Sequence, residues 1–174
     1  MDRNGKVLEL NHPDKQRIID RGTAYCMTAM MKNVVDHGTA KLIKELERPV
    51  AGKTGTTNHL YDAWFVGFTP QYVTGIWVGF DKEQSMGIGE TGSKAAAPIW
   101  LSYMKRMMEN RPVRVFTAPP GIEFATIDKE TGLLAIPESK ETLYQCFKEG
   151  TVPKKYTPKP DIINDQSEFF KQNM

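Results

Sequence analysis

The chain has 174 residues, of which 25% are charged and 40% hydrophobic, and its formal net charge is +2. This length fits about one domain with a core of its own. The basic residues are scattered along the chain rather than gathered in a stripe, which argues against a nucleic-acid partner.

The cysteines and histidines indicate neither a metal site nor a cofactor. No Cys-x-x-Cys or His-Glu-x-x-His spacing occurs, and His12, His37 and His59 stand alone in the sequence, so no metal ligand set is expected. Cys26 lies in an apolar helical pattern and is expected to be a buried free thiol. One disulfide between Cys26 and Cys146 is the alternative.

The first residues favour a start inside a domain. Met1 is followed by polar residues, so no secretory signal peptide is expected. The Asn-Gly pair within residues 3–6 predicts a hairpin whose returning strand is 7–10. The first strand of that hairpin has almost no residues, which favours a chain that begins part-way through a domain.

Two helices are expected next. Residues 21–37 repeat apolar side chains at helical spacing, with Asp20 or Thr23 as the N-cap and Gly38 after the last turn. A shorter helix is expected over 39–47. The side chains expected to form the buried face of the first helix are Ala24, Met27, Met30, Met31, Val34 and Val35.

Three strands then follow, at 50–56, 63–68 and 71–80, with a turn at 58–62. The uncharged run 63–80 is long enough for a membrane helix. However, Pro70 and recurring glycines interrupt it, which favours two strands. Short connections favour antiparallel pairing. The last two strands are apolar on both faces, which predicts a sheet covered on both sides.

A glycine-rich loop at 87–92 precedes a predicted helix over 94–109. Prolines then mark a linker, and a hairpin is expected from strands 122–127 and 133–136 with a turn at 128–132. From Lys148 onward the composition predicts a weakly ordered tail. The side chains expected on the buried side of the 94–109 helix are Ala96, Ala97, Trp100, Leu101, Met104, Met107 and Met108.

The segment Lys53-Thr54-Gly55-Thr56-Thr57 carries the clearest chemical signal. The edge of such a strand offers a backbone N–H to a developing oxyanion and can pair with an extended peptide. Gly55 lets a substrate approach closely. Lys53 favours an anionic substrate and lowers the pKa of a neighbouring proton carrier. The hydroxyls of Thr54 and Thr56 lie on one face of a strand, where both can bind one carboxylate.

A bare Lys-Thr-Gly occurs by chance in many proteins, but the surrounding residues extend it. These are the stretches 51–80, 89–92 with 95–100, and upstream 24–28 with 34–39. Together they resemble the class A penicillin-binding proteins, in which a Lys-Thr-Gly strand forms one wall of a serine active site. The resemblance runs from about residue 3 to residue 150 and is most specific at its centre.

The resemblance implies an α+β fold of the penicilloyl-serine transferase type, with helices packed on the faces of an antiparallel sheet. It implies that Lys53, Thr54, Gly55, Thr56 and Thr57 bind substrate and β-lactams, with the Thr56 N–H in the oxyanion hole. Members of the family are bifunctional peptidoglycan synthases with a membrane anchor and a glycosyltransferase domain. The expected location is therefore the cell envelope, on the periplasmic side of the cytoplasmic membrane.

The family's nucleophile is missing from the expected place. Its Ser-x-x-Lys and Ser-x-Asn motifs precede the Lys-Thr-Gly strand, but residues 1–52 contain no serine. The chain is therefore expected to be inactive alone and to need the N-terminal half of a transpeptidase domain. Without that half, an apolar core face is expected to be exposed and to favour self-association. A peptide-binding or scaffold module without catalysis is the alternative function.

Three further patterns are weaker. Ser102 and Lys105 form a Ser-x-x-Lys, but after the Lys-Thr-Gly strand and on the polar side of a helix. Gly52-Lys53-Thr54 lacks the first glycine of a phosphate-binding loop. The loop 87–92 lacks a preceding dinucleotide-binding strand, and a loop that shapes the rim of the peptide site is the preferred interpretation.

These patterns divide the chain into three expected parts. Residues 1–110 are expected to be the C-terminal part of a transpeptidase domain. Residues 111–147 are expected to be a linker and hairpin extension, and residues 148–174 the weakly ordered tail.

Overall fold

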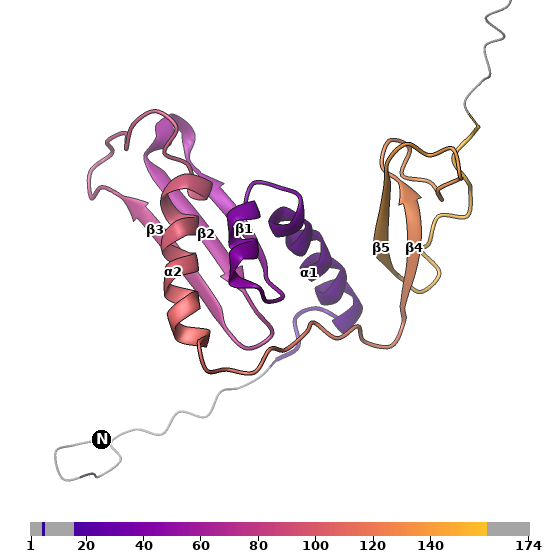
Figure 1. Ribbon diagram of the computed structural model, residues 1–174, viewed down its shortest axis with the longest axis horizontal. Helices are drawn as coiled ribbons and strands as arrows, with labels where there is room; N and C mark the ends of the chain where they lie inside the picture. The colour runs from indigo at the N-terminus through magenta and orange to yellow at the C-terminus, as the bar shows by residue number, and fades with distance from the viewer. Residues whose placement is uncertain (1–4, 6–15, 160–174) are drawn as a thin grey trace, which may run out of the picture.

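The computed structural model describes residue 5 and residues 16–159 (Figure 1). Apart from residue 5, the hairpin predicted at 3–10 lies outside the described residues, as does the last part of the predicted tail, 160–174.

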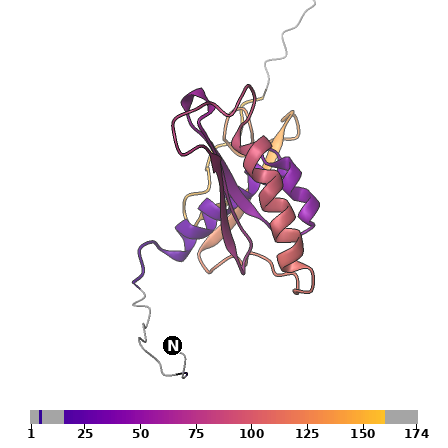
Figure 2. The same ribbon diagram turned by 90° about the vertical axis from the view of Figure 1, so that its left-hand side faces the viewer.

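The centre of the fold is a three-stranded antiparallel sheet in the order β1-β2-β3. Its strands are β1 (Ala51–Thr56), β2 (Asp62–Phe68) and β3 (Val73–Gly79). Helix α2 (Ala97–Met108) covers one face of this sheet, and α1 (Arg21–Asp36) lies beyond β1 (Figures 1 and 2). The predicted α+β class and the antiparallel pairing are confirmed, and the run 63–80 forms two strands.

Three short helical turns connect these elements: η1 (Lys41–Leu46), η2 (Asn58–Leu60) and η3 (Gly92–Ala96). The second predicted helix, over 39–47, is thus a 3-10 helix. It ends at Glu47, whose backbone is left-handed with a φ of 56°. The predicted helix over 94–109 begins as the wide turn η3 and continues as α2.

The contact between α2 and β2 forms the core. Trp100 of α2 packs edge-on against Phe65 of β2, with ring centroids 5.3 Å apart. The Trp100 indole N–H donates to the carbonyl oxygen of Thr74 on β3 at 3.0 Å, so its one polar group is satisfied. The predicted buried side of α2 is confirmed, except that Met107 is only partly buried.

The opposite face of the sheet differs from the prediction. Strand β2 alternates buried and exposed side chains, and Trp64, Val66 and Trp77 are each 44% exposed. The sheet is therefore uncovered on this face within the described residues, and the prediction of cover on both sides is wrong for them. The sequence shows which side chains are apolar, but not which of them its own helices can reach.

Helix α1 is also less buried than predicted. Asp20 caps it by accepting from the Thr23 N–H at 2.9 Å, which confirms one of the two expected caps. However, Met27 and Met30 are 50% and 54% exposed, and Val35 is the buried side chain of the helix. Helix α1 contacts three separate elements, β1, η1 and a strand of the C-terminal hairpin, and these do not cover the side that carries Met27 and Met30.

The C-terminal hairpin pairs β4 (Ile122–Asp128) with β5 (Thr142–Lys148). The predicted returning strand, 133–136, is wrong. This stretch forms no strand, although Leu134 makes isolated bridges with Ile127 and Tyr156. The Asp128 N–H donates to the Leu133 carbonyl at 2.9 Å, and the Ala135 N–H donates to the Thr126 carbonyl at 3.0 Å. Asp128 accepts from the backbone N–H groups of Glu130 and Thr131 and closes the turn, and Pro137 then ends the pairing because it has no N–H to donate.

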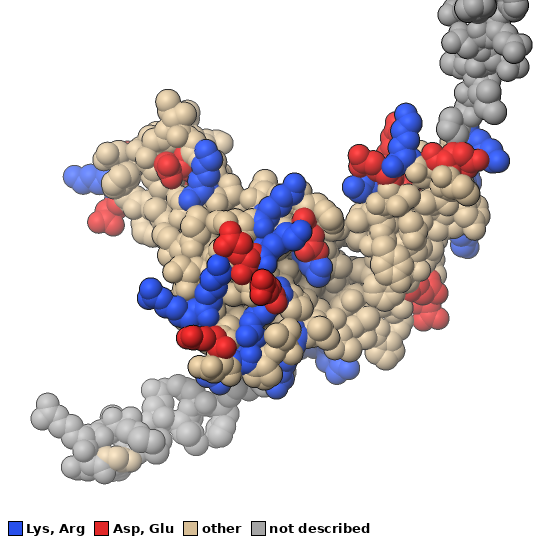
Figure 3. Space-filling model, viewed as in Figure 1, with Lys and Arg blue, Asp and Glu red and all other residues tan. Residues whose placement is uncertain are grey.

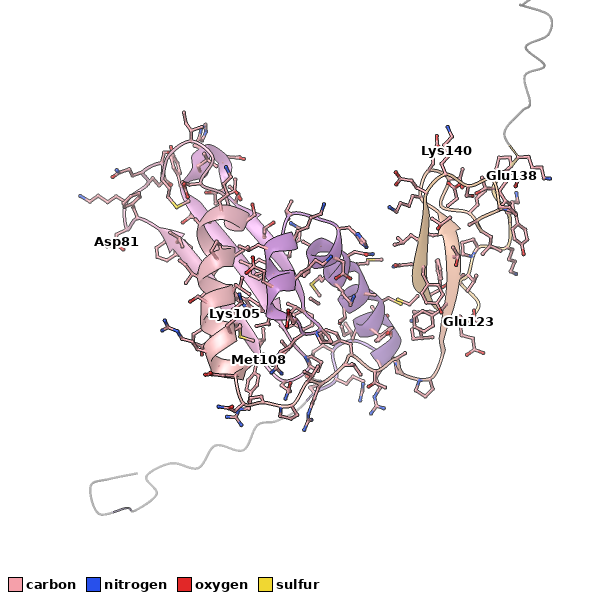
Figure 4. The ribbon with its side chains drawn as sticks, in the orientation of Figure 1. Asp81, Lys105, Met108, Glu123, Glu138 and Lys140 are labelled. Atoms are coloured by element: carbon pink, nitrogen blue, oxygen red, sulfur yellow. The ribbon has the colours of Figure 1, made fainter. Side chains whose placement is uncertain are left out.

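Residues after β5 also have defined contacts. Leu134 donates to the Lys155 carbonyl at 3.0 Å, and Thr157 donates to the Leu134 carbonyl at 2.8 Å. These residues, which the sequence assigns to the tail, are held against the loop between β4 and β5. Glu138 and Lys140 project from that same loop (Figure 4).

The core contact gives a direct stability test. Replacing Trp100 by Ala removes a fully buried indole, so the free energy of unfolding should fall by about 3–5 kcal/mol. Tyr103→Ala on the same helix is the matched control, because Tyr103 is 50% exposed and surface changes cost about 0.5 kcal/mol or less. Urea denaturation followed by circular dichroism measures both. Equal losses in the two variants would contradict this account of the core.

Candidate functional site

The Lys-Thr-Gly motif lies on the edge strand of the sheet. Lys53, Thr54, Gly55 and Thr56 belong to β1, and Thr57 follows it directly before η2. In the part of the chain that the structure describes, β1 pairs on one side with β2, and its other side is an open strand edge. An open edge presents unpaired backbone groups to which an extended peptide can add.

The hydrogen-bond alternation of the strand decides which groups face that edge. Thr57 donates to the Asp62 carbonyl at 3.1 Å and so faces β2. In an antiparallel strand, the backbone N–H and C=O of one residue point to the same side, and this side alternates from residue to residue. The backbone groups of Gly55 therefore point towards β2, and those of Thr54 and Thr56 point towards the open edge. The Lys53 ammonium donates to the Thr54 carbonyl at 2.9 Å, in keeping with an outward carbonyl.

The two threonine hydroxyls have partners on other elements. The Thr54 hydroxyl lies 3.1 Å from the Thr39 hydroxyl, between α1 and η1. The Thr56 hydroxyl accepts from the Gly92 N–H at 3.1 Å. Sequence reasoning missed both partners. Thr39 and Gly92 stand in stretches that carry the family resemblance, but no spacing rule connects them with β1.

The glycine-rich loop packs directly against the motif. A Cβ at Gly92 would lie 2.6 Å from the Gly55 carbonyl oxygen and 3.1 Å from its nitrogen. No side chain fits there, so the close approach of the two backbones requires glycine at position 92. Gly87 and Gly89 have φ values of 115° and 85°, which also favour glycine. The loop 87–92 therefore lies directly beside β1.

Lys53 shares its face of the sheet with an exposed aromatic pair. Lys53 and Gly55 are register partners of Val66 and Trp64 on β2. Trp64 and Trp77 lie tilted with centroids 6.4 Å apart. The indole N–H of Trp77 donates to the Asp62 carboxylate at 2.8 Å and is thereby fixed in orientation. A cation beside a half-exposed apolar surface is suited to bind a ligand that is apolar and anionic.

The second Ser-x-x-Lys has different surroundings. Ser102 is on the exposed side of α2, and Lys105 forms an ion pair with Glu45 of η1 at 3.0 Å. Figure 4 shows Lys105 on the surface of α2. The lysine is thus engaged in a surface ion pair and not by a serine hydroxyl.

The charged side chains show no single sign on the face in view. Lys and Arg alternate with Asp and Glu where η1 and α2 lie (Figure 3). Within residues 16–159, no three His, Cys, Asp or Glu side chains come together as a metal site would require. No helix in that range has the length and hydropathy needed to cross a bilayer.

Comparison with known proteins identifies the class. The family model of the penicillin-binding protein transpeptidase domain matches residues 4–105, and the model of the penicillin-binding protein 1A C-terminal domain matches residues 118–161. The chain therefore belongs to the penicillin-binding protein transpeptidase family.

Individual relatives agree with this assignment. The chain is 42% identical to penicillin-binding protein 1A of Pseudomonas aeruginosa over 79% of its own length, and 41% identical to that of Aquifex aeolicus over 88%. The crystal structure of penicillin-binding protein 1A from Haemophilus influenzae has a TM-score of 0.72 at 34% identity over 82% of this chain. The chain spans 17%, 21% and 22% of these three proteins.

The contact between Gly92 and Gly55 predicts a sharp local requirement. Gly92→Ala forces a methyl group into backbone atoms, and overpacking of this kind should lower the free energy of unfolding by about 1–3 kcal/mol. Gly75→Ala on β3 is the control, because its Cβ would meet only Val66 at 3.6 Å and should change stability by about 1 kcal/mol or less. Urea denaturation compares the two. If Gly92→Ala is as mild as Gly75→Ala, the two backbones are not in close contact.

Proposed function

We propose that this chain is the substrate-binding part of a serine D,D-transpeptidase that cross-links peptidoglycan stem peptides and is trapped by β-lactams. The observation that carries the proposal is the open edge of β1, which combines Lys53, an outward Thr56 N–H and two threonine hydroxyls. In this role the Thr56 N–H stabilises the oxyanion. Thr54 and Thr56 hold the substrate carboxylate, and Thr57 ends the peptide-binding segment.

The nucleophile in this proposal comes from outside the chain. No serine occurs in residues 1–52, and Ser102 lies on the exposed side of α2. A serine activated by a lysine must be brought to β1 by the preceding half of a transpeptidase domain. We therefore propose that the isolated chain is inactive, with residues 1–110 as its share of that domain. Residues 111–147 would be a linker and hairpin extension, and residues 148–174 would be a C-terminal tail.

The uncovered face of the sheet supports the same proposal. Trp64, Val66 and Trp77 form a half-exposed apolar surface beside Lys53. Contiguous apolar surface of this kind marks an interaction site. The missing half of the domain would cover it and bring the serine to Lys53. Alone, the chain would self-associate through this face. We place the protein on the periplasmic side of the cytoplasmic membrane, where peptidoglycan is cross-linked.

Fluorescent penicillin and denaturing electrophoresis test the assignment. The isolated chain should form no covalent adduct. Placed in penicillin-binding protein 1A of Pseudomonas aeruginosa instead of the matching stretch, it should restore a protein that penicillin labels. In that chimera Lys53→Ala should slow acylation by roughly 10²-fold, because Lys53 favours proton transfer by a neighbouring group, and such assistance typically contributes this much or more to a rate. Ser102→Ala should label at the unmodified rate.

The outcomes separate the proposal from its alternative. A covalent adduct on the isolated chain that Ser102→Ala abolishes would overturn the role given to β1. A peptide-binding module would instead bind stem peptide reversibly and give an inert chimera. The open edge of β1 gives this alternative its physical basis, because strand addition needs no nucleophile.

Sedimentation tests the role of the uncovered face. The isolated chain should form concentration-dependent oligomers, and Trp64→Ser with Trp77→Ser should shift it towards the monomer. Met27→Ser with Met30→Ser is the control, because those exposed side chains lie on α1 rather than on the sheet. A monodisperse monomer of the unmodified chain would count against this face as an interaction surface.

A further inference from the structure

The two cysteines meet where helix α1 packs on the C-terminal hairpin. Both are free thiols, and Cys146 on β5 is buried while Cys26 on α1 is partly exposed. The sequence predicted a buried thiol at Cys26, but Cys26 is only partly buried in the structure. The Cys26 thiol is among the groups that raise the pKa of Cys146, as a near neighbour would.

The packing at the start of α1 explains why the two thiols meet. Lys148 of β5 contacts the Asp20 carboxylate at 3.2 Å and the Thr23 hydroxyl at 3.4 Å. A Cβ at Gly22 would lie 3.6 Å from Ile122 and 3.7 Å from Lys148, which are register partners across the hairpin. The face of α1 that carries Gly22 therefore lies on the pair formed by Ile122 and Lys148.

The two cysteines lie next to this contact, Cys26 further along α1 and Cys146 further along the hairpin. Cys26 lies one turn after Gly22, on the same face of the helix, about 6 Å along its axis. Cys146 lies two residues before Lys148, on the same face of the hairpin, about 7 Å along the strand. Its register partner is Phe124, and the Tyr25 ring packs edge-on against Phe124 with centroids 6.3 Å apart. Cys26 and Cys146 thus lie at similar distances from the contact of Gly22 with Lys148, on the two surfaces that face each other.

We propose that Cys26 and Cys146 form an intrachain disulfide that fastens the C-terminal hairpin to helix α1. This inference goes beyond the proposed function and does not depend on it. The hairpin belongs to the part of the chain matched by the penicillin-binding protein 1A C-terminal domain, and α1 to the part matched by the transpeptidase domain. The disulfide would join these two parts covalently, in addition to the linker between α2 and β4.

The chemistry is a thiol–disulfide exchange with a small or protein disulfide as the oxidant. The Cys26 thiolate attacks the donor disulfide and releases one thiol. The Cys146 thiol loses its proton and attacks the sulfur of Cys26, which releases the second thiol. The two cysteines give up two protons and two electrons, and the donor becomes two thiols.

The order of the two steps follows from exposure. Cys26 is the more accessible thiol. Burial, together with the neighbouring Cys26, raises the pKa of Cys146 to about 11, so little of it is thiolate near neutral pH. Cys26 therefore reacts first with the donor, and Cys146 resolves the mixed disulfide because it is already in place.

The test uses the full chain, oxidised glutathione and intact-mass measurement under denaturing conditions. The unmodified chain should lose both thiols, become lighter by two hydrogens and retain no glutathione. Cys146→Ser should stop at one glutathione on Cys26. Cys26→Ser should take up glutathione much more slowly. Two retained glutathiones, two unreacted thiols or a dimer linked through cysteine would each overturn the proposal.

A matched variant tests the geometry. Thr28→Cys combined with Cys26→Ser moves the thiol two residues along α1 and so onto a different face of the helix. This variant should retain glutathione on the introduced thiol and form no cross-link to Cys146. Efficient cross-linking by this variant would mean that α1 and β5 are not packed in one fixed arrangement, and it would contradict the proposed contact of Cys26 with Cys146.

Trypsin gives an independent reading of the cross-link. Arg114 is exposed in the segment between α2 and β4 and is followed by Val115, so trypsin can cleave after it. After cleavage there, the hairpin fragment should stay attached to the α1 fragment on a non-reducing gel and separate on a reducing gel. Separation of the fragments under both conditions would show that no bond joins Cys26 to Cys146.

Discussion

The fold depends on how closely Trp100 approaches strand β2. A Cβ at Gly67 would lie 2.9 Å from the Trp100 ring and 2.7 Å from the Phe65 ring, so glycine at this position lets the indole lie against the strand. The Trp100 N–H then reaches the Thr74 carbonyl on β3. This contact fixes α2 across two strands, and interiors packed at this density allow little sliding. The segment before α2 is thereby fixed as well, which brings Gly92 onto Gly55.

The candidate site is thus built from two directions. Gly92 supports Thr56 from the start of the helix that covers the sheet, and Thr39 contacts Thr54 from the connection between α1 and η1. Neither partner belongs to β1. The shape of the open edge is consequently a property of the whole three-stranded unit, and a peptide carrying only the Lys-Thr-Gly residues would lack it.

The sequence predicts the local elements well and the long-range pairings poorly. The three strands of the sheet and the buried side of α2 follow from periodicity, because each element must bury one apolar stripe or face. The hairpin partner of β4 does not, because residues 133–136 are as apolar as a strand. The turn after Asp128 brings Leu133 back beside β4, but Pro137 has no N–H and ends that contact, and the full ladder forms with 142–148. The Met27 and Met30 stripe was also predicted as core, yet α1 has no element of the described chain along that side. For the site, the motif residues are readable from the sequence, but Thr39 is not, because a hydroxyl–hydroxyl contact leaves no periodic signal.

The partners of the two threonines bear on how a carboxylate would bind at β1. A hydroxyl has one proton to donate and two lone pairs to accept with. Because the Thr56 hydroxyl accepts from the Gly92 N–H, its proton stays available for a ligand oxygen. Thr54 keeps its own proton for the ligand only when Thr39 is the donor of their shared hydrogen bond. In the proposed role, an arriving carboxylate would select that arrangement, since it needs both protons directed outward. Gly92 and Thr39 would then act as donors that orient the two threonines, while Lys53 supplies the charge that attracts the anion.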